Sequence, residues 1–168
     1  MPRPFLLWPN PCLRTAAVPV EGVDDGVRSV WEEMLAAMYA MPGQGVGLAA
    51  PQLGIGLRLA VLDCSETRDQ PVRLANPRLL SAAEETRSYP EASPNLPGLS
   101  AEVTRPVWVE VTYMDETGAE VSQRFDGLWA TSVQHQMDHL DGRVFIDNLG
   151  PVRRQRLLTA YRKQRRKA

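Results

Sequence analysis

The sequence has few of the side chains that bind metals or form disulfides. Its 168 residues include only two cysteines, Cys12 and Cys64, and only two histidines, His135 and His139. The cysteines lie far apart, and neither has a partner at a metal-ligand spacing. We therefore expect two reduced thiols rather than a disulfide framework.

The sequence also lacks segments that would direct it into or across a membrane. It contains no run of about 18 apolar residues. Residues 1–5 show neither the basic segment nor the long apolar segment of a secretory signal. We expect a cytoplasmic protein without membrane interactions, folded as a single domain over residues 1–168.

Negative charge is absent from the C-terminal segment. Residues 151–168 hold eight lysines and arginines and no acid, so a chain with a net charge of −1 carries −9 on residues 1–150. We predict a basic helix over about residues 151–168, with Leu157, Leu158 and Tyr161 facing inward. Its outer face is either a solvated surface or an anchor for a polyanion such as ribosomal RNA.

The two histidines lie four residues apart, which places them on one face of a helix, where they can share a metal ion. In the motif His-Glu-x-x-His, the residue after the first histidine is a glutamate that acts as general base. Gln136 occupies that position here. An amide has no proton to exchange near neutral pH, so the scaffold of a zinc hydrolase is present without its base.

The remaining pattern alternates helical and strand-like segments. Helical periodicity begins at two acids, Asp24 and Asp25, and stops at residues 41–43. Proline excludes a helix from residues 5–14 and makes residues 89–99 an irregular loop or a sheet edge. The other predicted elements are strands at 58–63 and 70–77, a hairpin of 107–113 with 120–125, and the histidine helix at 127–140.

Small residues gather at Gly45, Val46, Gly47 and Leu48. Small side chains let another backbone approach closely, so this stretch either pairs with an extended peptide or forms a tightly packed turn.

With these stretches in this order, the chain resembles the peptide deformylase family, metalloenzymes that remove the formyl group from the starting methionine of new bacterial proteins. The family's first motif, Gly-x-Gly-x-Ala-Ala-x-Gln, is met in full at Gly45, Gly47, Ala49, Ala50 and Gln52. The resemblance covers nearly the whole chain. It implies an α+β fold in which antiparallel β-sheets pack around a central helix carrying the two histidines, with an N-terminal and a C-terminal helix.

The second family motif, Glu-Gly-Cys-Leu-Ser, reads Glu91-Ala92-Ser93-Pro94-Asn95 in this chain. In the family one cysteine and two histidines hold the metal, so Ser93 stands where the thiolate belongs, and a neutral hydroxyl is a poor ligand. The family polarises the substrate carbonyl with the glutamine side chain, here Gln52, and with a backbone N–H. Pro94 occupies the position of that N–H and has none.

Other family features remain. The resemblance implies that Glu91 and Arg105 pair and brace the second motif. Asp138 lies beside His139 and is expected to support or cap the helix rather than bind metal.

Together the substitutions predict a deformylase-like protein without the usual metal or activity, which keeps a groove for the N-terminal segments of peptides. The alternative is an active or weakly active deformylase in which Ser93, Asn95 or a water completes the metal shell. We expect no cofactor or, under the alternative, one divalent ion of iron, zinc or nickel at His135 and His139. The basic C-terminal helix makes the ribosome a candidate partner.

Overall fold

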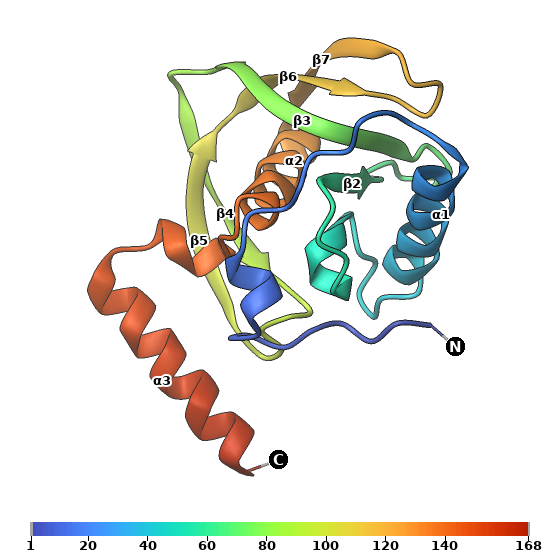
Figure 1. Cartoon of the computed structure of the whole chain (residues 1–168). Coiled ribbons are helices and arrows are strands. Elements are labelled where there is room, and N and C mark those ends of the chain that lie inside the picture. Colours follow the sequence, from blue (N-terminus) through green and yellow to red (C-terminus); the bar gives the residue numbers. More distant parts are fainter. Residues whose placement is uncertain (1, 168) are drawn as a thin grey trace.

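An antiparallel sheet of five strands, in the order β1-β2-β3-β6-β7, forms the frame of the fold, and helix α2 lies against it (Figure 1). The computed structural model describes residues 2–167. The 3-10 helices are η1 (Pro11–Arg14), η2 (Ala50–Leu53) and η3 (Phe145–Asn148), and the α-helices are α1 (Asp25–Tyr39), α2 (Gly127–Leu140) and α3 (Pro151–Lys167). The strands are β1 (Gly47–Ala49), β2 (Leu59–Leu62), β3 (Val72–Ala82), β4 (Thr86–Ala92), β5 (Ser100–Pro106), β6 (Trp108–Met114) and β7 (Glu120–Asp126).

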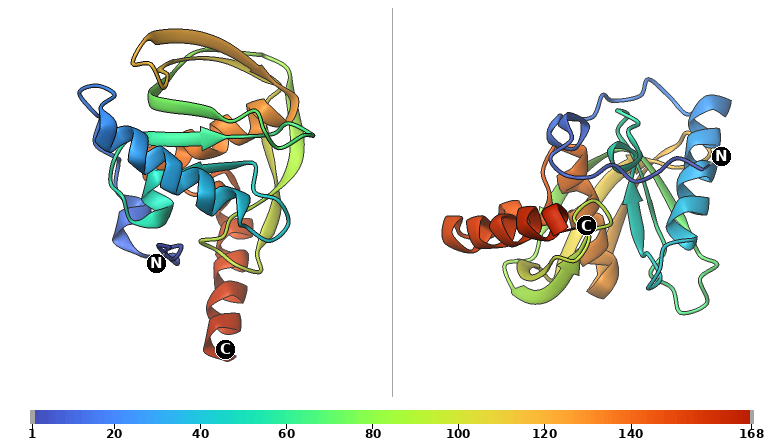
Figure 2. Two further views of the ribbon diagram at one scale, coloured as in Figure 1. Left: turned by 90° about the vertical axis from the view of Figure 1, so that its right-hand side faces the viewer. Right: turned by 90° about the horizontal axis from the view of Figure 1, so that it is seen from below.

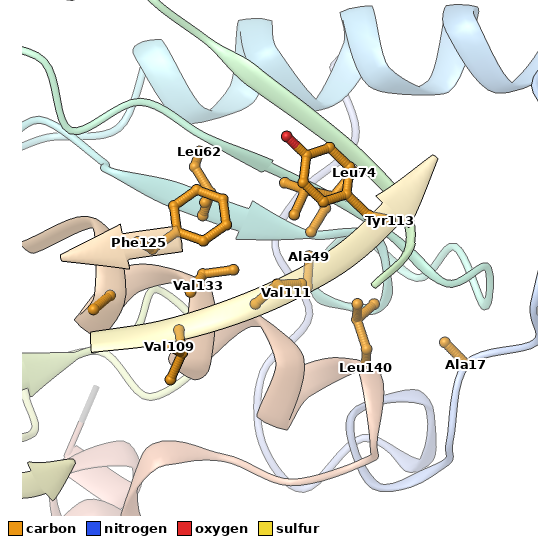
Figure 3. Packing of buried hydrophobic residues seen from close by; sticks show 12 residues of the cluster. Ala17, Ala49, Leu62, Leu74, Val109, Val111, Tyr113, Phe125, Val133 and Leu140 are labelled. Atoms are coloured by element: carbon orange, nitrogen blue, oxygen red, sulfur yellow. The ribbon is translucent and has the colours of Figure 1, made fainter. Parts of the chain in front are cut away.

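Strand β2 separates two apolar layers. All four of its side chains are buried, because the strand is covered on both faces. Leu59 and Val61 belong to the cluster under α1, whereas Ala60 and Leu62 belong to the cluster under α2. Figure 3 shows the second cluster, in which strand residues such as Leu62 and Val111 and helix residues such as Val133 and Leu140 come together.

The two helices that flank the sheet begin and end as the sequence predicts. The Asp24 carboxylate accepts a hydrogen bond of 2.8 Å from the backbone N–H of Val27 and caps α1. Helix α2 ends before Gly142, which has a φ of +77° and packs so closely that a Cβ would lie 2.9 Å from the backbone of Arg14. Glycine is thus required where this helix stops.

Two predicted boundaries differ from the structure because of proline. The strand predicted at 70–77 continues to Ala82, since Pro77 lies in a register shift between Ala75 and Arg78 where no ladder N–H is needed. In the N-terminal arm, which comprises residues 2–24, Pro11 starts the short helix η1, and the Asn10 side chain caps this helix.

Strands β4 and β5 form a separate two-stranded ribbon, and α3 extends away from the rest of the molecule (Figures 1 and 2). Its inward residues Leu158 and Tyr161 are buried in a third cluster with Trp8, Leu96 and Phe145. Antiparallel sheets with a central histidine helix and helices near both ends confirm the predicted α+β fold. No helix within residues 2–167 has the length and apolarity needed to span a bilayer.

Candidate active site

A cavity of about 640 Å³ opens between two strand edges above α2. One wall is the segment that leads into β1, and the other is the end of β4 with the loop that follows it. Among residues 2–167, β1 pairs only with β2 and β4 pairs only with β5, so each strand has a free edge. The lining residues include Gly45, Val46, Gly47, Gln52, Glu91, Ser93, Pro94, His135 and Gln136.

One face of α2 forms the floor of this cavity. Leu128, Thr131, Ser132 and His135 line it at the spacing of a single helical face. The ring centroids of His135 and His139 are 5.0 Å apart. Sequence reasoning missed the first three of these residues, although counting back along the helix from His135 by three, four and seven positions finds them.

His135 is held by a buried carboxylate. Its Nδ1 lies 2.8 Å from Oε1 of Glu91, and Arg105 donates to both oxygens of Glu91 at 2.6 and 2.9 Å. Burial raises the pKa of Glu91, but the hydrogen bonds and charges of Arg105 and His135 outweigh it and bring that pKa below its ordinary value. Because the ionised Glu91 accepts from Nδ1, the Nε2 of His135 keeps its lone pair for another partner.

Arg105 joins this pair to the next turn of the helix. Its Nη1 donates to Oδ2 of Asp138 at 3.0 Å, and Asn148 donates to the same oxygen at 3.0 Å. The structure therefore brings Glu91, Arg105 and Asp138 into one network behind the histidines.

His139 is a buried histidine of the helix core. It is 1% exposed, and within the described residues neither ring nitrogen has a hydrogen-bond partner. Burial, together with the neighbouring His135 ring and the Arg105 guanidinium, holds the pKa of His139 well below its usual value, so the ring is neutral. A desolvated lone pair without a partner is costly, and a cation would satisfy it.

Gln136 lies against β1. Its Nε2 is 2.6 Å from the point where a Cβ on Gly47 would stand, and its buried Oε1 has no partner in the described part of the chain. Ser132 lies just as close to that point and donates to the Val46 carbonyl at 3.1 Å. Leu48, in contrast, packs in the core under α1 and does not line the cavity.

The replaced second motif forms a hydrogen-bonded cluster with Gln52. Nε2 of Gln52 donates to Oδ1 of Asn95 at 2.6 Å and lies 3.4 Å from Oγ of Ser93. The Ser93 hydroxyl donates to the same Asn95 oxygen at 3.1 Å. Pro94 lines the cavity beside them.

These donors fit a divalent cation with an unusual shell. Within residues 2–167, no three side chains from histidine, cysteine, aspartate and glutamate form a ligand set. Glu91 nevertheless orients His135, and in the described chain neither ring nitrogen of His139 has a partner. Ser93 and Gln136, whose side-chain oxygens are neutral, line the cavity together with His135. A metal here would be held by two nitrogens and by neutral oxygens in place of a thiolate.

The chain is similar in sequence and in structure to known peptide deformylases. The family model of polypeptide deformylase matches residues 2–155. A peptide deformylase of Methylocella silvestris is 41% identical over 166 residues, covering 96% of this chain and 84% of that protein. Another from Acinetobacter baumannii is 41% identical, covering 92% and 86%. The crystal structure of a peptide deformylase from Legionella pneumophila superposes with a TM-score of 0.89 at 32% identity, covering 99% of this chain and 96% of that one.

These relatives contradict the prediction of a deformylase-like protein without activity. That prediction compared Ser93, Pro94 and Gln136 one by one with the family residues that they replace. In the folded chain the oriented His135 and the Gln52 donor line one cavity, and the buried His139, which has no partner in the described chain, lies against His135 with their ring centroids 5.0 Å apart. The alternative, an active or weakly active enzyme with a modified metal shell, agrees better with relatives that match nearly the whole chain and are named peptide deformylases.

Proposed function

The chain belongs to the polypeptide deformylase family, and from this premise we propose that it is a metal-dependent peptide deformylase with a modified metal shell. It would hydrolyse the formyl amide of N-formylmethionyl peptides and release formate. The observation that carries this proposal is the histidine pair, with His135 oriented by Glu91 and His139 buried without a partner in the described chain.

His135 and His139 would hold the ion, which in this family is typically a divalent metal; iron, zinc and nickel are the candidates. The hydroxyl of Ser93 and the carbonyl oxygen of Gln136 are the side-chain oxygens available to complete the shell. When bound, such an ion supplies Lewis-acid polarisation and makes water nucleophilic near neutral pH.

The chain's own residues orient the reacting groups. Gln52 lines the cavity, and the hydrogen on its Nε2 that is not bound to Asn95 would donate to the formyl oxygen as negative charge develops there. Gln136 lies beside the histidines and would hold the attacking water by hydrogen bonds, since an amide cannot take its proton. Glu91 and Arg105 keep His135 in place during the reaction.

The free edges of β1 and β4 suit an extended peptide. A substrate chain between them would pair through backbone hydrogen bonds, with its methionine side chain in the apolar part of the cavity near Val46 and Leu128. We therefore propose the N-terminal segments of newly made peptides as substrate, which places the chain in the cytoplasm.

A second partner is proposed for α3. Arg153, Arg156 and Lys163 are exposed and form no ion pair within residues 2–167. A row of unpaired positive charges on a projecting helix favours a polyanion, and the ribosome presents one close to the new peptide ends.

Formate release tests the proposal. Protein loaded with iron, zinc or nickel is incubated with formyl-Met-Ala-Ser and, as a matched control, with acetyl-Met-Ala-Ser. We expect formate from the first peptide and no acetate from the second. Equal rates with and without the loaded protein would overturn the proposal.

A further inference from the structure

Asn95 uses every hydrogen-bonding position of its side-chain amide. It is fully buried in the loop after β4. Its Nδ2 donates to the carbonyl of Leu6 at 2.5 Å and to the carbonyl of Gln52 at 3.2 Å. Its Oδ1 accepts from Nε2 of Gln52 at 2.6 Å and from the hydroxyl of Ser93 at 3.1 Å.

Backbone groups fix which end of the Asn95 amide points where. A backbone carbonyl accepts hydrogen bonds and never donates, so the NH₂ group must face the carbonyls of Leu6 and Gln52. A flip would place Oδ1 against two carbonyl oxygens and Nδ2 against the Nε2 donor of Gln52, so the hydrogen bonds to all three groups would be lost. Oδ1 of Asn95 therefore always faces Gln52.

The Gln52 amide is fixed in the same way from its other side. Its Oε1 accepts from the backbone N–H of Ala49 at 2.9 Å, which turns Nε2 toward Asn95. One of the two hydrogens on Nε2 is used in the 2.6 Å bond to Asn95. The other faces only the long 3.4 Å contact to Ser93, so it remains available to a group in the cavity that Gln52 lines.

We infer that Asn95 is a positioning residue for the deformylation reaction: it holds the Gln52 side chain so that one N–H points at the carbonyl oxygen of the substrate. This inference rests on the proposed function. Because Pro94 supplies no N–H, Gln52 is the donor on which this wall of the cavity depends. Donors that are fixed before the reaction stabilise developing charge better than mobile ones.

The contacts separate this role from that of a metal ligand. Oδ1 of Asn95 already accepts two hydrogen bonds, and Asn95 is not among the residues that line the cavity. The oxygen is therefore turned away from the space that a metal and substrate would fill.

The N-terminal arm is part of the same arrangement. Leu6 accepts from Asn95 and donates its own N–H to the Gln52 carbonyl at 2.9 Å, and the Trp8 N–H donates to the Asn95 carbonyl at 2.9 Å. Removing the Asn95 side chain thus loosens Gln52 and some arm contacts together, and the experiment must separate the two effects.

A double-mutant cycle makes that separation. We expect Asn95→Ala to lower kcat by roughly tenfold to a hundredfold, somewhat less than complete loss of an oxyanion donor, with KM nearly unchanged. Because Asn95 acts through Gln52, the double variant Gln52→Leu/Asn95→Ala should be no slower than Gln52→Leu alone.

Asn76→Gly is the matched control. Asn76 also ties the N-terminal arm through its side chain, with bonds of 2.7 and 2.9 Å to Val20, and glycine tolerates its φ of +51°. All variants are compared by urea unfolding and assayed under conditions in which each is folded. Asn76→Gly should lose stability without losing kcat. The inference is overturned if the two Asn95 effects multiply in the double variant, or if Asn76→Gly lowers kcat as much as Asn95→Ala.

A second readout does not need turnover. In ¹⁵N-labelled protein, the two side-chain N–H signals of Gln52 should be well separated and slow to exchange with water. They should shift toward free-amide values and exchange faster in Asn95→Ala and not in Asn76→Gly. If metal-loaded wild-type protein releases no formate, the proposed function fails, and the Gln52 signals alone decide the role of Asn95: unchanged signals in Asn95→Ala refute it.

Discussion

At the level of single residues, Glu91 connects the β4–β5 ribbon to helix α2. It lies at the end of β4, yet it orients His135 on α2 and accepts two hydrogen bonds from Arg105 on β5. Its side chain is 4% exposed, so these charge-assisted bonds act in a region largely without water. The retained motif residue therefore orients His135 even though its neighbours in the motif have changed.

Gln136 is the substitution whose effect on activity is easiest to isolate. Gln136→Glu restores a group that can take a proton from water beside the histidines. General-base catalysis is typically worth roughly 10²–10⁴-fold, so we expect kcat for formate release to rise by about 10²-fold or more. Steady-state kinetics at equal metal content measure this. Gln155→Glu, which adds the same charge on exposed α3, should leave kcat unchanged, and an equal rate in both variants would contradict the prediction.

Because of Asp63, we expect the free energy of unfolding to decrease at acid pH. It is fully buried and accepts hydrogen bonds of 2.5 Å from Tyr39 and of 2.5 Å from the Ser65 hydroxyl. Burial raises the pKa of Asp63, but the hydrogen bonds from Ser65, Tyr39 and Gln70 together lower it below its ordinary value.

Proton binding by Asp63 determines how the stability changes with pH. The unfolded chain takes up this proton near pH 3.9, before the folded chain does, so the stabilisation is present above about pH 4 and is lost as the pH falls further. Asp63→Asn should unfold more easily at neutral pH and lose less stability than the wild type between about pH 4 and about pH 2. Urea unfolding across this range measures both, and parallel curves would contradict the prediction.

For single residues, the sequence predicts which side chains belong to the site better than it predicts which side chains are in contact. The histidine spacing and the Glu91–Arg105 pair follow from the motifs, because these residues are close in sequence or belong to a known pattern. The role of Asn95 does not follow, since its partners Gln52 and Leu6 are 43 and 89 residues away. Only the folded chain brings the three amide and carbonyl groups together.

At the level of elements, Gly47 of β1 packs directly against α2. A Cβ there would overlap Ser132 and lie 2.6 Å from the Gln136 amide. We expect Gly47→Ala to cost about 1–3 kcal/mol of unfolding free energy by overpacking and to reduce formate release by displacing Gln136. Gly56→Ala is the control, since a Cβ there meets nothing within 4 Å. Similar urea midpoints for the two variants would show that α2 does not press against β1 in this way.

Helix α3 carries the prediction for a partner. Arg153→Glu/Arg156→Glu/Lys163→Glu should abolish co-sedimentation with ribosomes at low salt. The variant Arg153→Lys/Arg156→Lys/Lys163→Arg should keep it, because phosphate attraction depends on charge. Arg154 is left intact, since it pairs with Asp147 at 2.8 Å. Equal sedimentation of both variants would contradict a role for this face, and equal kcat on a short peptide shows that each remains folded.

Element boundaries were predictable where a local signal marks them. The Asp24 cap, the glycine at 142 and the hairpin around 115–118 are such signals, and the structure has the elements there. The continuation of β3 past Pro77 was not predictable, because it depends on a bulge opposite β6. The 3-10 helix at Pro11 was missed because proline excludes the interior of a helix but suits its first position.

For the molecule as a whole, the site exists because two separate sheets meet over one helix. The five-stranded sheet supplies the edge at β1, and the β4–β5 ribbon supplies the opposite edge (Figure 1). The sequence predicts strands of the five-stranded sheet at 58–63, 70–77, 107–113 and 120–125 through their periodicity. It does not predict the β4–β5 ribbon, because the prolines of residues 89–99 indicate an irregular loop or a sheet edge. The placement of the ribbon is also not predictable from the sequence, because it depends on the burial of Val103 in the third apolar cluster, with Trp8 and Phe145.

The most direct test of the proposed chemistry is a joint measurement of metal content and turnover. Chelator-treated wild-type protein and His139→Ala are reloaded with zinc, iron or nickel, and bound metal and formate release are measured on the same samples. We predict that the wild type regains one ion per chain and that formate release rises in proportion, whereas His139→Ala binds none tightly. Full loading of the wild type without formate release, or equal metal binding by His139→Ala, would contradict the assignment of the histidine pair as the metal centre of an active deformylase.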